Sequence, residues 1–422
     1  MNEMKGKSKL LKAGILCLAS LSLVGCGKDD GLTADGKVEI EYFNQKKEMT
    51  DTITEIAQDF EAQNPDIKIK VVDVPSPGDV LKTRVLAGDL PDVMNTYPQS
   101  LELQEWAKAG YLEDVKDQPF MKNLKEGYAE KYEVEGGIYN VPLSANMYGF
   151  YYNATKFKEL GYEVPETWAE FEALVDQMIA DGQVPFAIAG SEGWTLNGYH
   201  QLAIATVTGG FQPANDYLRF SQPNSISADD EILKADAQRL DLLRRPGAMQ
   251  QNWQGASYTD ALATFARGDA LMTVNGSWAL TMINEQEPQF EVATFPFPGN
   301  NPGESLTIGS GDFALSISAT TPHKEEALRF VEYLTTPEAM QKYYDVDGSP
   351  VTVKGVKMKE DSELAGLAQY AFTDQHIVWL AQNWTSENDY YTLTTNYLTT
   401  GDLERMAQDL NAFFNPMKAD VK

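Results

Sequence analysis

VEIEYFNQKKEMTDTITEIAQDFEAQNPDIKIKVV, residues 38–72, is the stretch of this sequence that decides the fold. Its first six residues alternate apolar and polar side chains, which predicts a strand over 38–43. A helix follows from about Asp51 and ends at Asn64-Pro65, because proline cannot continue a helix. The apolar face of that helix comprises Ile53, Ile56, Ala57 and Phe60. A second strand, predicted over 67–74, completes a strand–helix–strand unit with parallel strands.

The alternation of strands and helices continues along the chain. A short helix over 79–86 and a third strand over 92–95 predict an α/β fold with a largely parallel sheet. Thr167 and Glu170 form a capping box, which marks the start of a helix. Further segments are a strand over 184–190, a helix–strand–helix run over 261–280, strands within 305–319, helices over 324–334 and 337–344, and a mainly helical stretch over 364–417.

Length and charge restrict the class of protein. The chain has 422 residues and a formal net charge of −28. So acidic a chain repels nucleic acid and anionic lipid, and the sequence holds no basic patch to offset this repulsion. Because 43% of the residues are hydrophobic and the chain is too long for one core, we expect a globular protein with two lobes.

The N-terminus has the pattern of an export signal. Four lysines precede an apolar run over 13–24, which is too short to span a bilayer. Leu23-Val24-Gly25-Cys26 resembles a bacterial lipobox, which predicts removal of a signal peptide over 1–25, acylation of Cys26 and a polar tether over 26–37. The alternative is an ordinary signal peptide with an incidental cysteine. Cys17 lies in the removed segment, so the lipobox interpretation leaves the mature protein without a free thiol.

No motif for catalysis, metal binding or cofactor binding in this sequence has all the residues, spacings and positions that it requires. Residues 31–37 approach a phosphate-binding loop but precede the first strand, whereas such a loop must follow one. In Asp345-Val-Asp347-Gly348 the glycine comes too early for a calcium loop, so we expect a solvated turn. The histidines lack zinc spacing, and no nucleophile elbow is present. We therefore predict no catalytic residues, no metal and no cofactor, although the many carboxylates leave a glycosidase pair open.

Amides and aromatic side chains stand near the ends of predicted strands, where open α/β sheets bind ligands. A sugar presents flat C–H faces and rims of hydroxyl groups, so its site needs aromatic rings and planar hydrogen-bonding groups. The candidates are Asn44, Lys46, Asn95, Asn146, Trp194 and Trp278. The alternatives are structural: a turn cap for Asn44, strand-end hydrogen bonds for Asn95 and Asn146, solvent for Lys46, and core packing for the two tryptophans.

Four further motifs follow the strand–helix–strand opening in a fixed order. They are LAGDLPDV (86–93), GGIYNVP ahead of YYN (136–153), FARGDALMTVNGSW (265–278) and ISATTPHKEEALRFVEYLTTPEAMQKYY (317–344). In this order they resemble the extracellular solute-binding proteins of ABC sugar importers, over nearly the whole mature chain. EYFNQKKEMT and NAFFNPMKAD are similar to the raffinose- and multiple-sugar-binding lipoproteins among them.

The resemblance implies a two-lobe, periplasmic-binding-protein-like (Venus flytrap) fold of the α/β class, in which the chain crosses three times between the lobes. By position, the crossings are expected near 145–149, 274–276 and 312–316. The first lobe would then comprise 38–145 and 277–314, and the second lobe 146–276 and 315–422.

The resemblance also implies roles for site residues. In the family a tryptophan after the second crossing stacks on the sugar, and Trp278 occupies that place. Trp194 matches an aromatic residue of the second lobe, and Asn146 a polar contact at the first crossing. The C-terminal stretch FTDQHIVWL is similar to a cluster that holds a terminal galactose in some relatives. It would supply Phe372 as a plate, with Asp374 and His376 as hydrogen-bonding groups.

The implied function is that of a receptor that captures a short oligosaccharide and delivers it to the transmembrane subunits of an ABC permease. Raffinose-family sugars and other α-1,6-galactosides are the first expectation. The lobes would close on the ligand without a covalent step. We expect a monomer held at the outer face of the cell membrane by the lipid on Cys26. A surface glycoside hydrolase or lyase, a carbohydrate-binding adhesin, and a receptor for peptides or polyamines stay open as alternatives.

Overall fold

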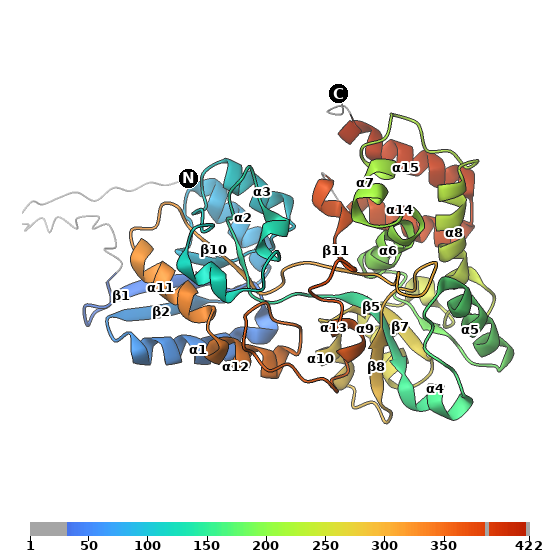
Figure 1. Ribbon diagram of the computed structural model, residues 1–422, viewed down its shortest axis with the longest axis horizontal. Coiled ribbons are helices and arrows are strands. Elements are labelled where there is room, and N and C mark those ends of the chain that lie inside the picture. Colours follow the sequence, from blue (N-terminus) through green and yellow to red (C-terminus); the bar gives the residue numbers. More distant parts are fainter. Residues whose placement is uncertain (1–31, 385–387, 419–422) are drawn as a thin grey trace, which may run out of the picture.

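The computed structural model describes residues 32–384 and 388–418, which form two lobes side by side (Figure 1). Each lobe contains one mixed β-sheet with helices packed around it. We term residues 32–142 and 314–359 the first lobe, and residues 148–309, 363–384 and 388–418 the second lobe. The predicted α/β class and two-lobe architecture are confirmed.

The first-lobe sheet has the strand order β2-β1-β3-β10-β4. β1 (Val38–Phe43) lies between β2 (Ile67–Val72) and β3 (Val93–Asn95) and is parallel to both. β10 (Ala314–Ile317) is antiparallel to β3 and to β4 (Val141–Pro142). The predicted parallel opening is therefore confirmed, and a late antiparallel strand makes the sheet mixed.

Helix α1 (Thr50–Gln63) shows how the sequence forms this lobe. Its predicted apolar face is buried, and the helix ends just before Asn64. Phe60 packs edge-on against Phe330, with ring centroids 5.2 Å apart. The other helices of this lobe are α2 (Pro77–Ala87), α3 (Leu101–Lys108), α11 (Lys324–Leu334) and α12 (Pro337–Asp347). Segments far apart in the sequence thus share one core.

The second-lobe sheet has the order β11-β9-β5-β7-β6, and β8 also pairs with β5. β5 (Tyr148–Asn153) is antiparallel to β7 (Met272–Gly276), β8 (Val292–Phe295) and β9 (Thr307–Gly309). β6 (Phe186–Ala187) runs parallel to β7, and β11 (His376–Val378) runs parallel to β9. Because β5 contacts three of the other strands, it forms the centre of this lobe.

Helices surround this second sheet. They are α4 (Ala154–Leu160), α5 (Trp168–Ala180), α6 (Asn197–Thr208), α7 (Phe211–Leu218), α8 (Glu231–Arg244), α9 (Tyr258–Ala266), α10 (Ala279–Asn284), α13 (Ala365–Ala368), α14 (Asn388–Thr400) and α15 (Leu403–Lys418). The predicted capping box begins α5: the Thr167 hydroxyl accepts the N–H of Glu170, whose carboxylate accepts the N–H of Thr167. Sequence-local signals thus predict helix starts well.

Three segments join the lobes: 143–147 between β4 and β5, 310–313 between β9 and β10, and 360–362 before α13. The first two are antiparallel, because Asp312 N–H donates to Ser144 O and Asn146 N–H to Ser310 O, both at 3.0 Å. On the other edge of the first segment, Ala145 N–H donates to Pro350 O at 2.8 Å. The first two crossings are therefore hydrogen-bonded to each other between the lobes.

The predicted division of the chain is wrong for two long segments. Residues 277–309 lie in the second lobe, because β8 and β9 pair with β5. Residues 315–359 lie in the first lobe, because β10 pairs with β3 and α12 packs on α1. The predicted crossing at 274–276 is also wrong, since this stretch of β7 pairs with β5 inside the second sheet. Local patterns do not specify which of two similar sheets a late strand joins.

The N-terminal predictions fall mostly outside the described residues. The signal peptide, Cys26 and the first part of the tether lie within residues 1–31. Residues 32–37 form a turn rather than a free tether: Leu32 pairs with Val38, and Gly36 N–H donates to Thr33 O at 2.9 Å. Within the two described ranges, no helix has the length and apolarity needed to cross a membrane.

Candidate ligand-binding site

Asn44 and Lys46 follow β1 and are buried in the first lobe. The Asn44 amide donates to Lys46 O at 2.9 Å and to Thr50 Oγ1 at 2.8 Å, and its oxygen accepts the N–H of Lys46 at 3.0 Å. These bonds close the turn before α1, which favours the capping role for Asn44. Lys46 is 3% exposed, so it is not a solvated lysine. Because internal partners engage both side chains, we leave them out of the candidate site.

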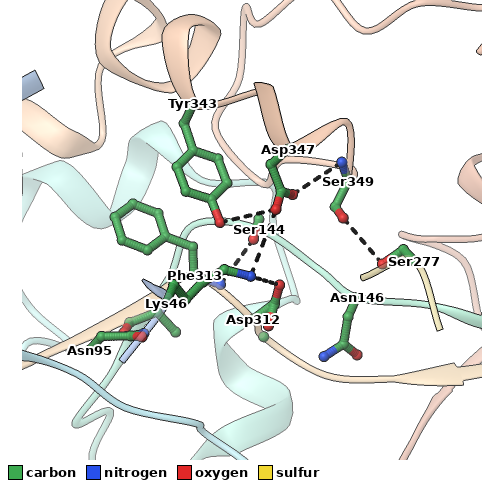
Figure 2. A network of polar contacts seen from close by, with 12 residues as sticks. Lys46, Asn95, Ser144, Asn146, Ser277, Asp312, Phe313, Tyr343, Asp347 and Ser349 are labelled. Carbon is green, nitrogen blue, oxygen red and sulfur yellow. Dashed lines mark hydrogen bonds and ion pairs between the residues drawn. The ribbon is translucent and has the colours of Figure 1, made fainter. Parts of the chain in front are cut away.

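Lys46 is the centre of a buried charge cluster beside the crossings (Figure 2). Its ammonium nitrogen lies 2.5 Å from the Asp312 carboxylate and 3.7 Å from that of Asp347, the last residue of α12. Burial raises the pKa of Asp347, and the positive charge of Lys46 opposes this rise. The expected solvated turn at 345–348 is therefore wrong for Asp347. Elsewhere too, the described side chains form no group of three or more His, Cys, Asp or Glu fit to hold a metal ion.

Asn95 is the last residue of β3, and Asn146 lies on the first crossing. The Asn95 amide donates to Ala314 O at 2.8 Å, a strand-end bond, while its Oδ1 is buried without a hydrogen-bond partner among the described residues. Asn146 Oδ1 accepts the N–H of Ser310 at 2.9 Å. Its amide nitrogen, by contrast, makes no hydrogen bond within the described part of the chain. Asn146 therefore keeps donors for a ligand at the junction of the lobes.

Trp278 stands directly before α10, two residues after the end of β7. Its ring lies over Gly276, where an added Cβ would come within 2.4 Å of three ring carbons. The ring packs 6.4 Å from that of Tyr148, yet it is only partly buried. Glycine at 276 thus makes room for an indole that is not part of a closed core. Its contact with a ligand stays a prediction.

Trp194 precedes α6 and is 37% exposed. Its ring packs against Tyr258 with centroids 5.0 Å apart, and its Nε1 donates to Glu192 at 3.0 Å. The other carboxylate oxygen of Glu192 accepts the N–H of Tyr258 at 2.7 Å. Glu192 therefore orients both aromatic rings and has both oxygens engaged, unlike a free catalytic carboxylate.

Tyr148, the first residue of β5, connects these aromatic residues. It is buried, and its hydroxyl donates to Thr195 O at 2.5 Å, next to Trp194. The Trp379 ring packs against it at 6.0 Å, at a similar distance to that of Trp278. One buried tyrosine beside the first crossing thus fixes the surroundings of both predicted tryptophans. We term Asn146, Trp194, Tyr258 and Trp278 the candidate site.

Phe372 contacts the first lobe. The Lys125 ammonium lies 3.5 Å from the centre of its ring, and Tyr128 packs edge-on against it at 5.4 Å. Burial lowers the pKa of Lys125 to about 8. A lysine covers one face of Phe372, so the structure favours a contact between lobes over the predicted open plate.

Asp374 and His376 also approach the first lobe, through Lys131. Burial lowers the pKa of Lys131, and the charge of Asp374, which is exposed, partly offsets this lowering. Lys131 Nζ donates to His376 O at 3.4 Å. The His376 ring is buried, with Nδ1 2.8 Å from Thr307 Oγ1 and Nε2 unpaired among the described residues. Burial, with the charge of Lys131, lowers its pKa to about 3.

Replacing His376 by glutamine should flatten the dependence of stability on pH. Because the folded state resists protonating this imidazole, its stabilising contribution is complete above the ordinary pKa of about 6.5 and is lost as the pH falls toward 3. We expect the unfolding free energy to fall by about 3 kcal/mol more between pH 7 and pH 4 in the wild type than in the His376→Gln variant. Urea unfolding at both pH values measures this. His323→Gln is the control, and an equal effect there would contradict the assignment.

Sequence reasoning missed several residues that the structure brings together. Tyr258 belongs to the candidate site and Glu192 holds it there, yet the sequence analysis assigned neither residue a role. Between the lobes, the Gln104 amide donates to Gln382 O at 3.2 Å. These partners are far apart in the chain, so no local pattern indicates them.

The candidate site combines indole and phenol faces with the Asn146 amide nitrogen, which has no hydrogen-bond partner among the described residues. Aromatic faces attract the C–H faces of a pyranose ring, and amide N–H groups donate to its hydroxyls. Glu192, the carboxylate that contacts Trp194 and Tyr258, is engaged internally. The arrangement is therefore suited to a neutral polyol rather than to an amine or an anion.

Comparison with known proteins gives the family. The model for the bacterial extracellular solute-binding protein family matches residues 46–341. The multiple sugar-binding protein of Streptococcus mutans serotype c is 56% identical over 419 residues, 99% of this chain and 100% of that protein. The solved apo-form of RafE from Streptococcus pneumoniae is 63% identical, with a TM-score of 0.88 over 90% of this chain and 98% of that one.

A second solved structure, RafE in complex with raffinose, is also 63% identical and has a TM-score of 0.85, covering 90% of this chain and 100% of its own. A chitin oligosaccharide binding protein with 22% identity shares the fold at a TM-score of 0.73, over 91% of this chain and 99% of its own. The family model and the long match to the streptococcal relative lead to one conclusion: the chain belongs to the family of bacterial extracellular solute-binding proteins.

Proposed function

We propose that this protein is the sugar-binding receptor of an ABC importer and captures a short oligosaccharide outside the cell. The observation that carries the proposal is the candidate site: two incompletely buried indoles, Trp194 and Trp278, arranged around Tyr148 next to the amide of Asn146. Binding between two lobes allows the ligand to favour their closed arrangement, which a permease can recognise.

Raffinose-family oligosaccharides are the ligand that we propose first. RafE, at 63% identity, has been solved in complex with raffinose, and the relative from Streptococcus mutans is named a multiple sugar-binding protein. These relatives support a galactosyl-sucrose sugar such as raffinose or stachyose, followed by other α-1,6-linked glucosides and galactosides.

Isothermal titration of residues 28–422, which include every described residue, tests the proposal against raffinose, maltotriose and a peptide mixture. We expect saturable one-to-one binding of raffinose. Binding of maltotriose alone would support the receptor function but contradict raffinose as the ligand. Binding of peptides alone would contradict the sugar assignment. Release of smaller sugars on long incubation, detected by chromatography, would favour a hydrolase instead.

We also propose that a lipid on Cys26 holds the receptor, as a monomer, at the outer face of the cell membrane near its permease. The lipobox-like Leu23-Val24-Gly25-Cys26 supports this. In cells fed labelled palmitate, the wild type should carry the label in the membrane fraction. Cys26→Ala should carry none, and label on that variant would contradict the site of acylation.

A further inference from the structure

Ser277 ties the start of the Trp278 segment to the first crossing. Its N–H donates to Met147 O at 2.7 Å, and its hydroxyl accepts the N–H of Met147 at 3.3 Å. Ser277 is 2% exposed, and Trp278 is the next residue. The position of the indole thus depends on where Ser277 is held.

The Ser277 hydroxyl also reaches across to the first lobe. It lies 3.1 Å from the hydroxyl of Ser349, which is equally buried. Ser349 follows α12 in the first lobe, whereas Ser277 follows β7 in the second. A buried hydrogen bond therefore joins the two lobes one residue away from Trp278 (Figure 2).

Ser349 is in turn fixed by the buried charge cluster. Its N–H donates to the Asp347 carboxylate at 3.2 Å, and the Tyr343 hydroxyl lies 3.5 Å from the same carboxylate. Asp347 faces Lys46, and Lys46 in turn pairs with Asp312 on the crossing segment 310–313. Because these charges lie in a low-dielectric interior, moving any one of them would separate charges that water cannot solvate. Ser349 therefore has little freedom to shift.

We propose that Ser349 and Ser277 are positioning residues for the sugar site, and the inference rests on the proposed function. Their bond sets the place of Trp278 relative to the first lobe, and the Lys46–Asp312–Asp347 cluster anchors the bond on the first-lobe side. Neither serine touches the sugar. Without this bond, the lobes sample a wider range of arrangements, and fewer of them match the ligand.

Two measurements on Ser349→Ala and Ser277→Ala test the proposal. Loss of one buried hydrogen bond corresponds to a weakening of raffinose binding by about five- to tenfold, seen mainly as faster dissociation. The double variant should bind no more weakly than Ser277→Ala alone, because Ser277→Ala already removes the bond to Ser349 together with the one from Met147. Ser349→Thr keeps the hydroxyl and should retain wild-type affinity.

The second measurement reports on the lobes themselves and needs no ligand. Residues 28–422 contain no cysteine, so Leu86→Cys in α2 and Leu160→Cys in α4 give one spin-label site on each lobe. Both leucines are exposed, at 84% and 36%. We expect the distance distribution between the labels to broaden in Ser349→Ala and to stay unchanged in Ser318→Ala, a buried serine with bonds inside the first lobe.

An unchanged distribution in Ser349→Ala would overturn the positioning role, whatever the sugar affinity. A broadened distribution with unchanged raffinose affinity would overturn it as well, since Trp278 would then be placed independently of the lobes. If the wild type binds no raffinose, the proposed ligand fails, and the distance measurement alone still decides whether the serine bond fixes the lobes.

Discussion

Replacing Lys46 by methionine is expected to lower the free energy of unfolding by about 3–5 kcal/mol, the cost of removing one partner from a buried ion pair. Methionine keeps most of the side-chain volume but leaves the Asp312 and Asp347 carboxylates buried without a cation between them. Urea unfolding followed by tryptophan fluorescence measures the loss.

The matched control is Lys234→Met on the surface of the second lobe. Lys234 lies 2.9 Å from Glu231, but the pair is exposed, and such pairs contribute at most about 1 kcal/mol. Adding Asp312→Asn and Asp347→Asn to Lys46→Met should recover part of the stability, because the triple variant buries no unpaired charge. Equal losses for Lys46→Met and Lys234→Met would contradict the importance of the cluster.

Replacing Trp278 by alanine is expected to weaken raffinose binding by about 30- to 1,000-fold, the range for a central aromatic contact. The reason is the partial burial of the ring, which leaves indole surface open for contact with a sugar. Titration calorimetry measures the affinity, and thermal unfolding of the same sample shows whether the fold survives.

Two variants separate stacking from general damage. Trp278→Phe keeps an aromatic face and should retain much of the affinity that alanine loses. Trp106→Ala removes a partly buried tryptophan from α3 in the first lobe, outside the candidate site, and should leave the affinity close to that of the wild type. Unchanged affinity in Trp278→Ala would assign the indole to packing alone.

Much of the local structure could be predicted from the sequence, because it depends on neighbouring residues. Residues within a few positions of one another determine the apolar face of α1, the end of that helix at Asn64 and the capping box at Thr167. Chain length predicted two lobes, and the resemblance of ordered motifs specified the kind of two-lobe fold. The assignment of 277–309 and 315–359 to lobes failed, since it depends on which distant strand each segment meets.

Only those members of the candidate site that local sequence marks could be predicted. Trp278 and Asn146 stand at a helix start and on a crossing, positions that a sequence pattern marks. The partners that decide the roles of Lys46 and Phe372 lie 266 and 247 positions away, at Asp312 and Lys125. The sequence around a residue does not show whether a lysine is buried or solvated, or whether the ring of a phenylalanine is covered or open to a ligand.

The pairing of β10 with β3 and of β11 with β9 has a consequence for how the protein matures. No single uninterrupted stretch of the sequence contains a whole lobe. A chain that leaves the cell N-terminus first holds only β1, β2, β3 and β4 of its first sheet until residue 314 has emerged, and its second sheet waits for residue 376. Because both sheets are completed late, the chain stays unfolded for longer and can pass through a narrow export channel. Stable tertiary structure forms only when nearly all of the chain is outside.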